Sequence, residues 1–232
     1  MSSVDRVELV SDLEFVLALI KELIPKKKVP WEVEPHIFGG WVRDLIRGVP
    51  FKDMDVQVPN LEVAEALIER FEKSKQMISL ERRIMKDYFP TRPSLEYQCF
   101  SIQIRTPTTA VLNIDISYSM ATFLGEDSLH ICEFTVNNLM TDINGNISTR
   151  IKAYQIGMGN RYNDAEWTAK CIRDCIEGKL VWMIPDRFSK SMGATEASQS
   201  EFMEKMKLRL QKMQSKGFVL TGEHLTSFRL AQ

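Results

Sequence analysis

The sequence predicts an α/β (α+β) domain, in which a short, mixed and mostly antiparallel sheet is flanked by helices, and a small helical extension. Two observations indicate this fold class. Apolar and polar residues alternate, as they do in half-buried strands, at residues 53–58, 100–104 and 111–118. Apolar residues recur with helical spacing at residues 4–24, 61–71 and 165–177. We expect one domain over residues 1–155 and the extension over residues 160–232.

Length and composition limit the possible functions. The chain has 232 residues, of which 44% are hydrophobic, so it can bury a substantial core. It has no run of about 18 apolar residues and no secretory signal, which predicts a cytoplasmic protein with no membrane partner. Its four cysteines lack paired zinc-type spacing and are expected to be reduced. The net charge of −1 provides no overall basic field, so any RNA contact must be local.

The first candidate functional segment contains paired glycines. After the helix predicted over residues 4–24, a short extended segment leads into Gly39 and Gly40, and a short helix follows and ends at Gly48. Glycines allow a backbone to approach a ligand closely, and the amino end of a helix attracts anions. The segment therefore predicts a phosphate-binding turn, although an isolated Gly-Gly pair is usually only a turn.

Two aspartates follow in a strand-like segment. Alternation over residues 53–58 places Asp53, Asp55 and Gln57 on one face and the apolar residues on the other. Carboxylates about 7 Å apart along one strand can share two divalent ions held about 4 Å apart. Such a pair is usually a surface or calcium-loop feature when it occurs alone. Next to a phosphate-binding turn it predicts phosphoryl or nucleotidyl transfer.

A third carboxylate is centred on a later strand. Over residues 111–118 the apolar side chains face one way, and Asn113, Asp115 and Ser117 face the other. An isolated Asp115 would more often face solvent. If this strand pairs in register with residues 53–58, three carboxylates converge and Asp115 becomes the third metal ligand.

The remaining segments predict ordinary connecting structure. Asn60 is expected to cap the helix over residues 61–71, and the basic, proline-containing residues 73–96 are expected to form a charged surface loop, with a guide for a polynucleotide as the alternative. Residues 139–150 predict a hairpin around a primed turn at Asn144 and Gly145.

The last part of the chain predicts two helices and a short apolar run between them. Asn163 or Asp164 is expected to cap the helix over residues 165–177, and residues 179–184 form the apolar run, which Pro185 ends. Residues 189–200 then form a connector, and a capping box from Ser198 to Glu201 starts a basic helix that ends at Gly217.

The glycine and aspartate segments together resemble a family signature. Residues 36–48 and 52–56 are similar to the Gly-Gly-x-Val-Arg-Asp and Asp-x-Asp motifs of polymerase-beta superfamily nucleotidyltransferases, in particular the head domain of class II tRNA CCA-adding enzymes and bacterial poly(A) polymerases. The resemblance implies template-independent transfer of a nucleoside monophosphate from ATP or CTP to an RNA 3′ hydroxyl, with Mg²⁺ or Mn²⁺. It implies catalytic and metal-binding roles for Asp53, Asp55 and Asp115. It implies nucleotide binding by Gly39, Gly40, Arg43, Asp44, Thr135 and Asn137.

The sequence also departs from this family. Residues 133–139 resemble the motif Arg-Arg-Asp-Phe-Thr-Ile-Asn-Ala-Leu, but Ile131 and Cys132 replace the arginines and Glu133 replaces the aspartate. The resemblance is weak beyond residue 150 and ends near residue 218, with no convincing copy of the family's neck motif, so a protein partner is a candidate for supplying RNA binding. Two alternatives remain: transfer to a protein or small molecule, and a non-catalytic head that binds nucleotide, RNA or protein.

Overall fold

The computed structural model describes two compact units. The described residues are 14, 18, 35–49, 51, 53–58, 60–86, 96–108, 111–118, 133–142, 144–183 and 196–224. The first unit contains the described residues that fall within 14–86, 96–118 and 140–147. The second unit contains the described residues that fall within 133–139 and 148–224. The predicted boundary between residues 155 and 160 stays a prediction. Most of the helix predicted over residues 4–24 lies outside the described residues, although Glu14 and Ala18 are helical.

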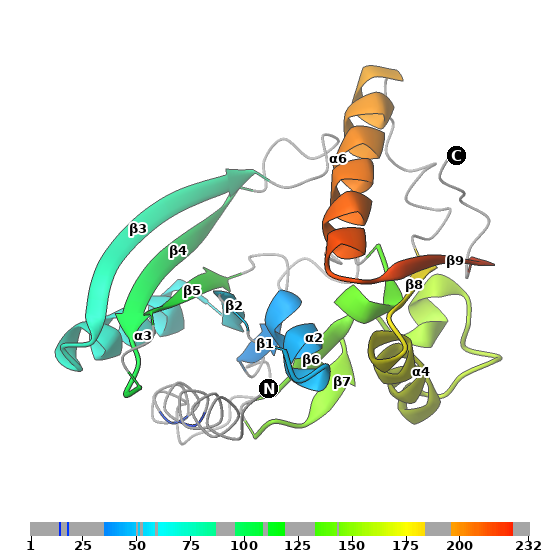
Figure 1. The fold of residues 1–232 in the computed structure, drawn as a ribbon. Helices are drawn as coiled ribbons and strands as arrows, with labels where there is room; N and C mark the ends of the chain where they lie inside the picture. Colours follow the sequence, from blue (N-terminus) through cyan, green and yellow to red (C-terminus); the bar gives the residue numbers. More distant parts are fainter. Residues whose placement is uncertain are drawn as a thin grey trace. The chain divides into compact units, whose positions relative to one another are not determined.

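A seven-stranded sheet, mostly in the first unit, confirms the predicted fold class (Figure 1). Its strand order is β3-β4-β5-β2-β1-β6-β7. Strands β2 and β5 pair in parallel, whereas β1 is antiparallel to β2 and β6, and β4 is antiparallel to β3 and β5. The strands are β1 (His36–Phe38), β2 (Asp53–Val58), β3 (Met77–Lys86), β4 (Glu96–Arg105), β5 (Val111–Tyr118), β6 (Leu139–Thr141) and β7 (Ile147–Thr149).

Helix α3 (Leu61–Lys73) packs against β2, β4 and β5 through its apolar side. The helix begins where the sequence predicts it to begin, after the capping residue Asn60, whose side chain accepts a hydrogen bond from the Val63 N–H at 2.9 Å. Met54, Val56 and Val58 alternate with the polar residues of β2 and are buried. The apolar face of the sheet is therefore the core of this unit, and the opposite face carries the polar side chains.

The prediction of a loop over residues 73–96 is wrong for residues 77–86, and residues 87–95 lie outside the described part of the chain. Residues 77–86 form β3, an edge strand that runs beside β4 in a long curved pair (Figure 1). The alternation is hard to recognise because Arg82 occupies a position on the apolar face. Its guanidinium lies 5.5 Å from the centre of the Phe100 ring, where a cation–π contact replaces an apolar side chain.

The predicted hairpin is present, but its turn is not of the primed type. Among the described loop residues only Gly145 has a positive φ, 83°, and its N–H donates to the Asp142 carbonyl. This is the geometry of a three-residue loop that ends in a left-handed glycine. The Asp142 carboxylate fixes the loop by accepting from the N–H groups of Asn144 and Asn146, both at 2.8 Å.

Replacing Asp142 with alanine is expected to lower the free energy of unfolding by about 1–2 kcal/mol at neutral pH, because these hydrogen bonds are lost. Burial raises the pKa of Asp142, but hydrogen bonds from Asn146 and Asn144 outweigh it and hold the pKa below its ordinary 3.8. The stabilisation is therefore complete above about pH 3.8 and is lost as the pH falls through the lower folded-state pKa. Urea unfolding of both proteins across this range measures the difference. An equal difference at neutral and acid pH would contradict the role of the charge.

In the described part of the second unit, two α-helices accompany a two-stranded parallel sheet. Its elements are the 3₁₀ helices η3 (Thr135–Asn137) and η4 (Ala153–Ile156), α4 (Asp164–Ile176), β8 (Lys179–Trp182), α6 (Glu196–Ser215) and β9 (Val219–His224). Asn163 and Glu166 form a capping box at the start of α4, as the cap prediction allowed. The predicted start of α6 at Ser198 was wrong, because the helix begins at Glu196. Strand β9, which pairs with β8, was not predicted. Among the described residues, no helix is long and apolar enough to cross a membrane.

Candidate active site

The turn between β1 and helix α2 (Gly40–Ile46) lies against an aspartate of β2. Gly39 precedes the helix with φ 80° and ψ −145°, a conformation that is essentially restricted to glycine. A Cβ atom at this position would collide with the Asp55 carboxylate. Phe38 is also paired with Asp55 in the sheet. The structure thus brings two of the predicted site residues, Gly39 and Asp55, into close contact.

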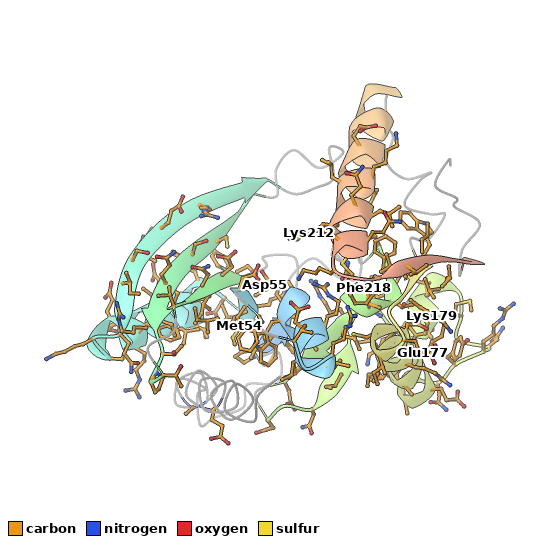
Figure 2. All side chains as sticks on the ribbon, in the orientation of Figure 1. Met54, Asp55, Glu177, Lys179, Lys212 and Phe218 are labelled. Atoms are coloured by element: carbon orange, nitrogen blue, oxygen red, sulfur yellow. The ribbon has the colours of Figure 1, made fainter. Side chains whose placement is uncertain are left out.

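The parallel pairing of β2 and β5 brings two acidic side chains side by side. Asp55 stands opposite Asp115, and Asp53 stands opposite Asn113, all on the polar face. Figure 2 labels Asp55 next to the buried Met54 on β2. Neighbouring strands lie about 4.8 Å apart, so the Asp55 and Asp115 carboxylates can share one ion.

The donor set of this site fits a hard divalent cation. Carboxylate oxygens are the ligands that Mg²⁺ and Mn²⁺ prefer. Within the described residues, no three acidic, histidine or cysteine side chains already form a metal-binding group. Asp55 and Asp115 are the carboxylates that the sheet register places directly opposite one another. Asp53 lies two residues before Asp55 on β2, and its side chain would have to turn toward them to complete a set of three carboxylates.

Helix α2 places two charged side chains next to the glycine turn. Arg43 and Asp44 are only 5% and 6% exposed, and the Arg43 Nε lies 3.5 Å from Asp44 Oδ1. A Cβ atom on Gly40 would lie 3.2 Å from Arg43 Nη2, so the guanidinium folds back over the turn. The positive charge is therefore held at the point where the sequence predicts phosphate binding.

A cysteine on the same face of the sheet is kept in its neutral form. Cys99 is buried on β4 opposite Ser117. Burial, followed by the negative charges of Asp115 and Asp55, raises the pKa of its thiol to about 11. At neutral pH the side chain is a thiol and not a thiolate.

The second unit holds the two other predicted nucleotide-binding residues. The Thr135 hydroxyl is buried and donates to Asp174 Oδ2 at 2.7 Å, and the Lys170 ammonium lies 3.3 Å from the same oxygen. Asn137 is half-buried, and its amide donates to Glu133 Oε1 at 3.2 Å. Thr135 is thus fixed to α4, and the side chain of Asn137 is oriented by Glu133.

An arginine that the sequence motifs did not indicate contacts Glu133. The Nη1 of Arg209, on α6, lies 2.9 Å and 3.2 Å from the two Glu133 carboxylate oxygens. The Glu133 side chain is 1% exposed, so this ion pair offsets the cost of burying its charge. Ile131 and Cys132, which stand where the resembled motif has arginines, lie outside the described residues. The basic character of α6 was the only signal in the sequence for a cation at this motif.

Comparison with known proteins finds similar solved structures. No family model and no curated protein matches the chain. The chain is similar to solved CCA-adding enzymes. The Thermotoga maritima CCA-adding enzyme complexed with tRNA is 17% identical, with a TM-score of 0.47, over 92% of this chain and 39% of that one. A CCA-adding enzyme complexed with ATP is 18% identical, with a TM-score of 0.43, over 81% of this chain and 37% of that one. The chain thus spans less than two thirds of either enzyme.

Replacing Arg209 with methionine is expected to lower the free energy of unfolding by about 1–3 kcal/mol, because the Glu133 carboxylate stays buried without this cation. Because Arg209 is partly exposed and its charge is screened by solvent, the range extends down to about 1 kcal/mol. The matched control is Lys207→Met on the same helix, whose ion pair with Glu204 is exposed and should contribute almost nothing. Adding Glu133→Gln to Arg209→Met should recover part of the loss in chemical denaturation. Equal effects of Arg209→Met and Lys207→Met would show that the buried pair does not stabilise this unit.

Proposed function

We propose that the chain is a metal-dependent nucleotidyltransferase that moves a nucleoside monophosphate from ATP or CTP to the 3′ hydroxyl of an RNA. The observation that carries the proposal is the contact between the Gly39 turn and the Asp55 carboxylate, with Asp115 in register on the next strand. A phosphate-binding turn placed directly against paired carboxylates is what phosphoryl transfer requires, since the phosphates and their counter-charges must meet at one point.

The described residues suit distinct roles in this reaction. Asp53 and Asp55 would hold Mg²⁺ or Mn²⁺, with Asp115 as the third ligand. The bound ions supply charge neutralisation at the phosphates. Backbone N–H groups at Gly39 and Gly40, with Arg43 and Asp44 behind them, would position the triphosphate. The family resemblance also assigns nucleotide binding to Thr135 and Asn137, although the Thr135 hydroxyl is buried and already donates to Asp174.

The bond changes define what the acceptor site must do. The 3′ oxygen of the RNA bonds to the α-phosphorus, the bond between the α-phosphorus and the bridging oxygen breaks, and pyrophosphate leaves. The proton of the attacking hydroxyl has to go to a base, and Asp115 is the carboxylate that we assign to this role. A separate protein that binds RNA would complete the acceptor site, because the near-neutral chain has no strong overall attraction for polynucleotides.

The test is incubation of the purified chain with each labelled nucleoside triphosphate, Mg²⁺ or Mn²⁺ and a mixed RNA pool, in parallel with the Asp55→Asn variant. Label on RNA 3′ ends with the wild type alone supports the proposal and identifies the nucleotide. Transfer to added protein or small molecules, with none to RNA, would support the same chemistry with another acceptor. Absence of any transfer, together with absence of nucleotide binding by calorimetry, would overturn the proposal.

A further inference from the structure

We propose that Ser101 is a positioning residue for Asp115, and that its hydroxyl orients this carboxylate for binding a divalent cation. The inference rests on the proposed function in one respect, namely that Asp115 is a metal ligand. It adds a residue on β4, a strand to which the motifs assign no role.

The sheet register places Ser101 directly beside the carboxylate. Asp115 lies between two neighbours on the polar face: Asp55 on β2 and Ser101 on β4. The Ser101 hydroxyl donates to Asp115 Oδ1 at 2.5 Å. Within the described part of the chain, Ser101 is the residue whose side chain hydrogen-bonds to the Asp115 carboxylate.

This arrangement gives the two carboxylate oxygens of Asp115 different roles. A carboxylate has about four lone-pair sites, and one of them on Oδ1 accepts the serine proton. The hydrogen bond restricts rotation of the carboxylate and leaves Oδ2 for another ligand. Groups that orient metal ligands in this way change metal affinity or activity by about 10- to 100-fold when they are removed.

A second serine on the same face provides a matched control. The Ser79 hydroxyl, on β3, bonds to Gln103 Oε1 at 3.3 Å and not to an acidic residue. Ser79→Ala therefore removes the same atoms from the same face of the same sheet, without changing a carboxylate. Ser101→Thr keeps the hydroxyl and is expected to bind metal nearly as the wild type does.

The experiment measures Mn²⁺ binding directly, by electron paramagnetic resonance of the free ion, with no nucleotide present. We expect Ser101→Ala to weaken Mn²⁺ binding about 10- to 100-fold, Ser79→Ala to leave it unchanged and Ser101→Thr to restore it. Thermal unfolding without metal should be similar for the two alanine variants, which separates positioning from a loss of stability.

The outcomes distinguish this inference from the proposed function. Equal Mn²⁺ affinities of Ser101→Ala and Ser79→Ala would overturn the role of Ser101 and leave the nucleotidyltransferase proposal standing. Weaker binding by Ser101→Ala in a protein that transfers no nucleotide would support the role of Ser101 and count against the proposed reaction. A wild-type protein that binds no Mn²⁺ would overturn the inference itself.

Discussion

Replacing Asp55 with asparagine is expected to reduce nucleotide incorporation at least about 100-fold while the protein stays folded. The exchange keeps the shape of the side chain and removes the negative charge that lies between the Gly39 turn and Asp115. Catalysis of phosphoryl transfer consists mainly of positioning and charge neutralisation, so losing one metal carboxylate removes a large part of it. Initial rates of labelled nucleotide incorporation measure the effect, and circular dichroism checks the fold.

The control for Asp55→Asn is Glu65→Gln, which removes one negative charge from the exposed side of α3. It should leave incorporation within about twofold of the wild type, because an exposed charge away from the polar face is screened by solvent. Retained incorporation by Asp55→Asn would exclude this carboxylate from catalysis. Equal losses in both variants would mean that total charge, and not the site, governs the assay.

Replacing Gly39 with alanine is expected to reduce incorporation by a similar factor, about 100-fold, for a steric reason. The new Cβ would collide with the Asp55 carboxylate, and φ 80° with ψ −145° is strained for any residue with a side chain. Either the turn or the carboxylate must move, and a displacement of about 1 Å at a reacting centre can cost 100-fold in rate. Incorporation assays and Mn²⁺ binding on the folded variant measure the two consequences separately.

Gly48→Ala separates the collision from the cost of a positive φ. Gly48 has φ +63°, and a Cβ atom there would have no neighbour within 4 Å. The variant should lose about 1 kcal/mol of stability and keep its activity. If Gly48→Ala loses as much incorporation as Gly39→Ala, backbone strain alone explains the result and the close approach to Asp55 has no special role.

Local patterns in the sequence were sufficient to predict the elements that build the polar face. Alternation over residues 53–58 and 111–118 predicted which side chains share a face, because a strand has a period of two. Capping residues predicted where α3 and α4 begin: Asn60 for α3, and Asn163 or Asp164 for α4, of which Asn163 is the cap. These features depend on interactions within a few residues of chain.

The contacts that complete the site depend on pairing between distant segments. Ser101 reaches Asp115 only because β4 and β5 adopt one particular register, and Arg209 reaches Glu133 from a helix 76 residues later in the chain. Neither of these two contacts can be predicted from the residues that are near it in the sequence. Strand β3 was missed because Arg82 hides its alternation, and β9 was missed because its pairing with β8 has no local signal.

The parallel pairing of β2 with β5 also determines the order in which the site can form during folding. Parallel neighbours cannot be joined by a tight turn, and here residues 59–110, with α3, β3 and β4, intervene between them. Closing such a long loop is slow compared with forming a hairpin or a helix. We therefore expect the two carboxylates to meet late in folding. A fragment that contains the glycine turn and β2 alone lacks Asp115 and has no complete site.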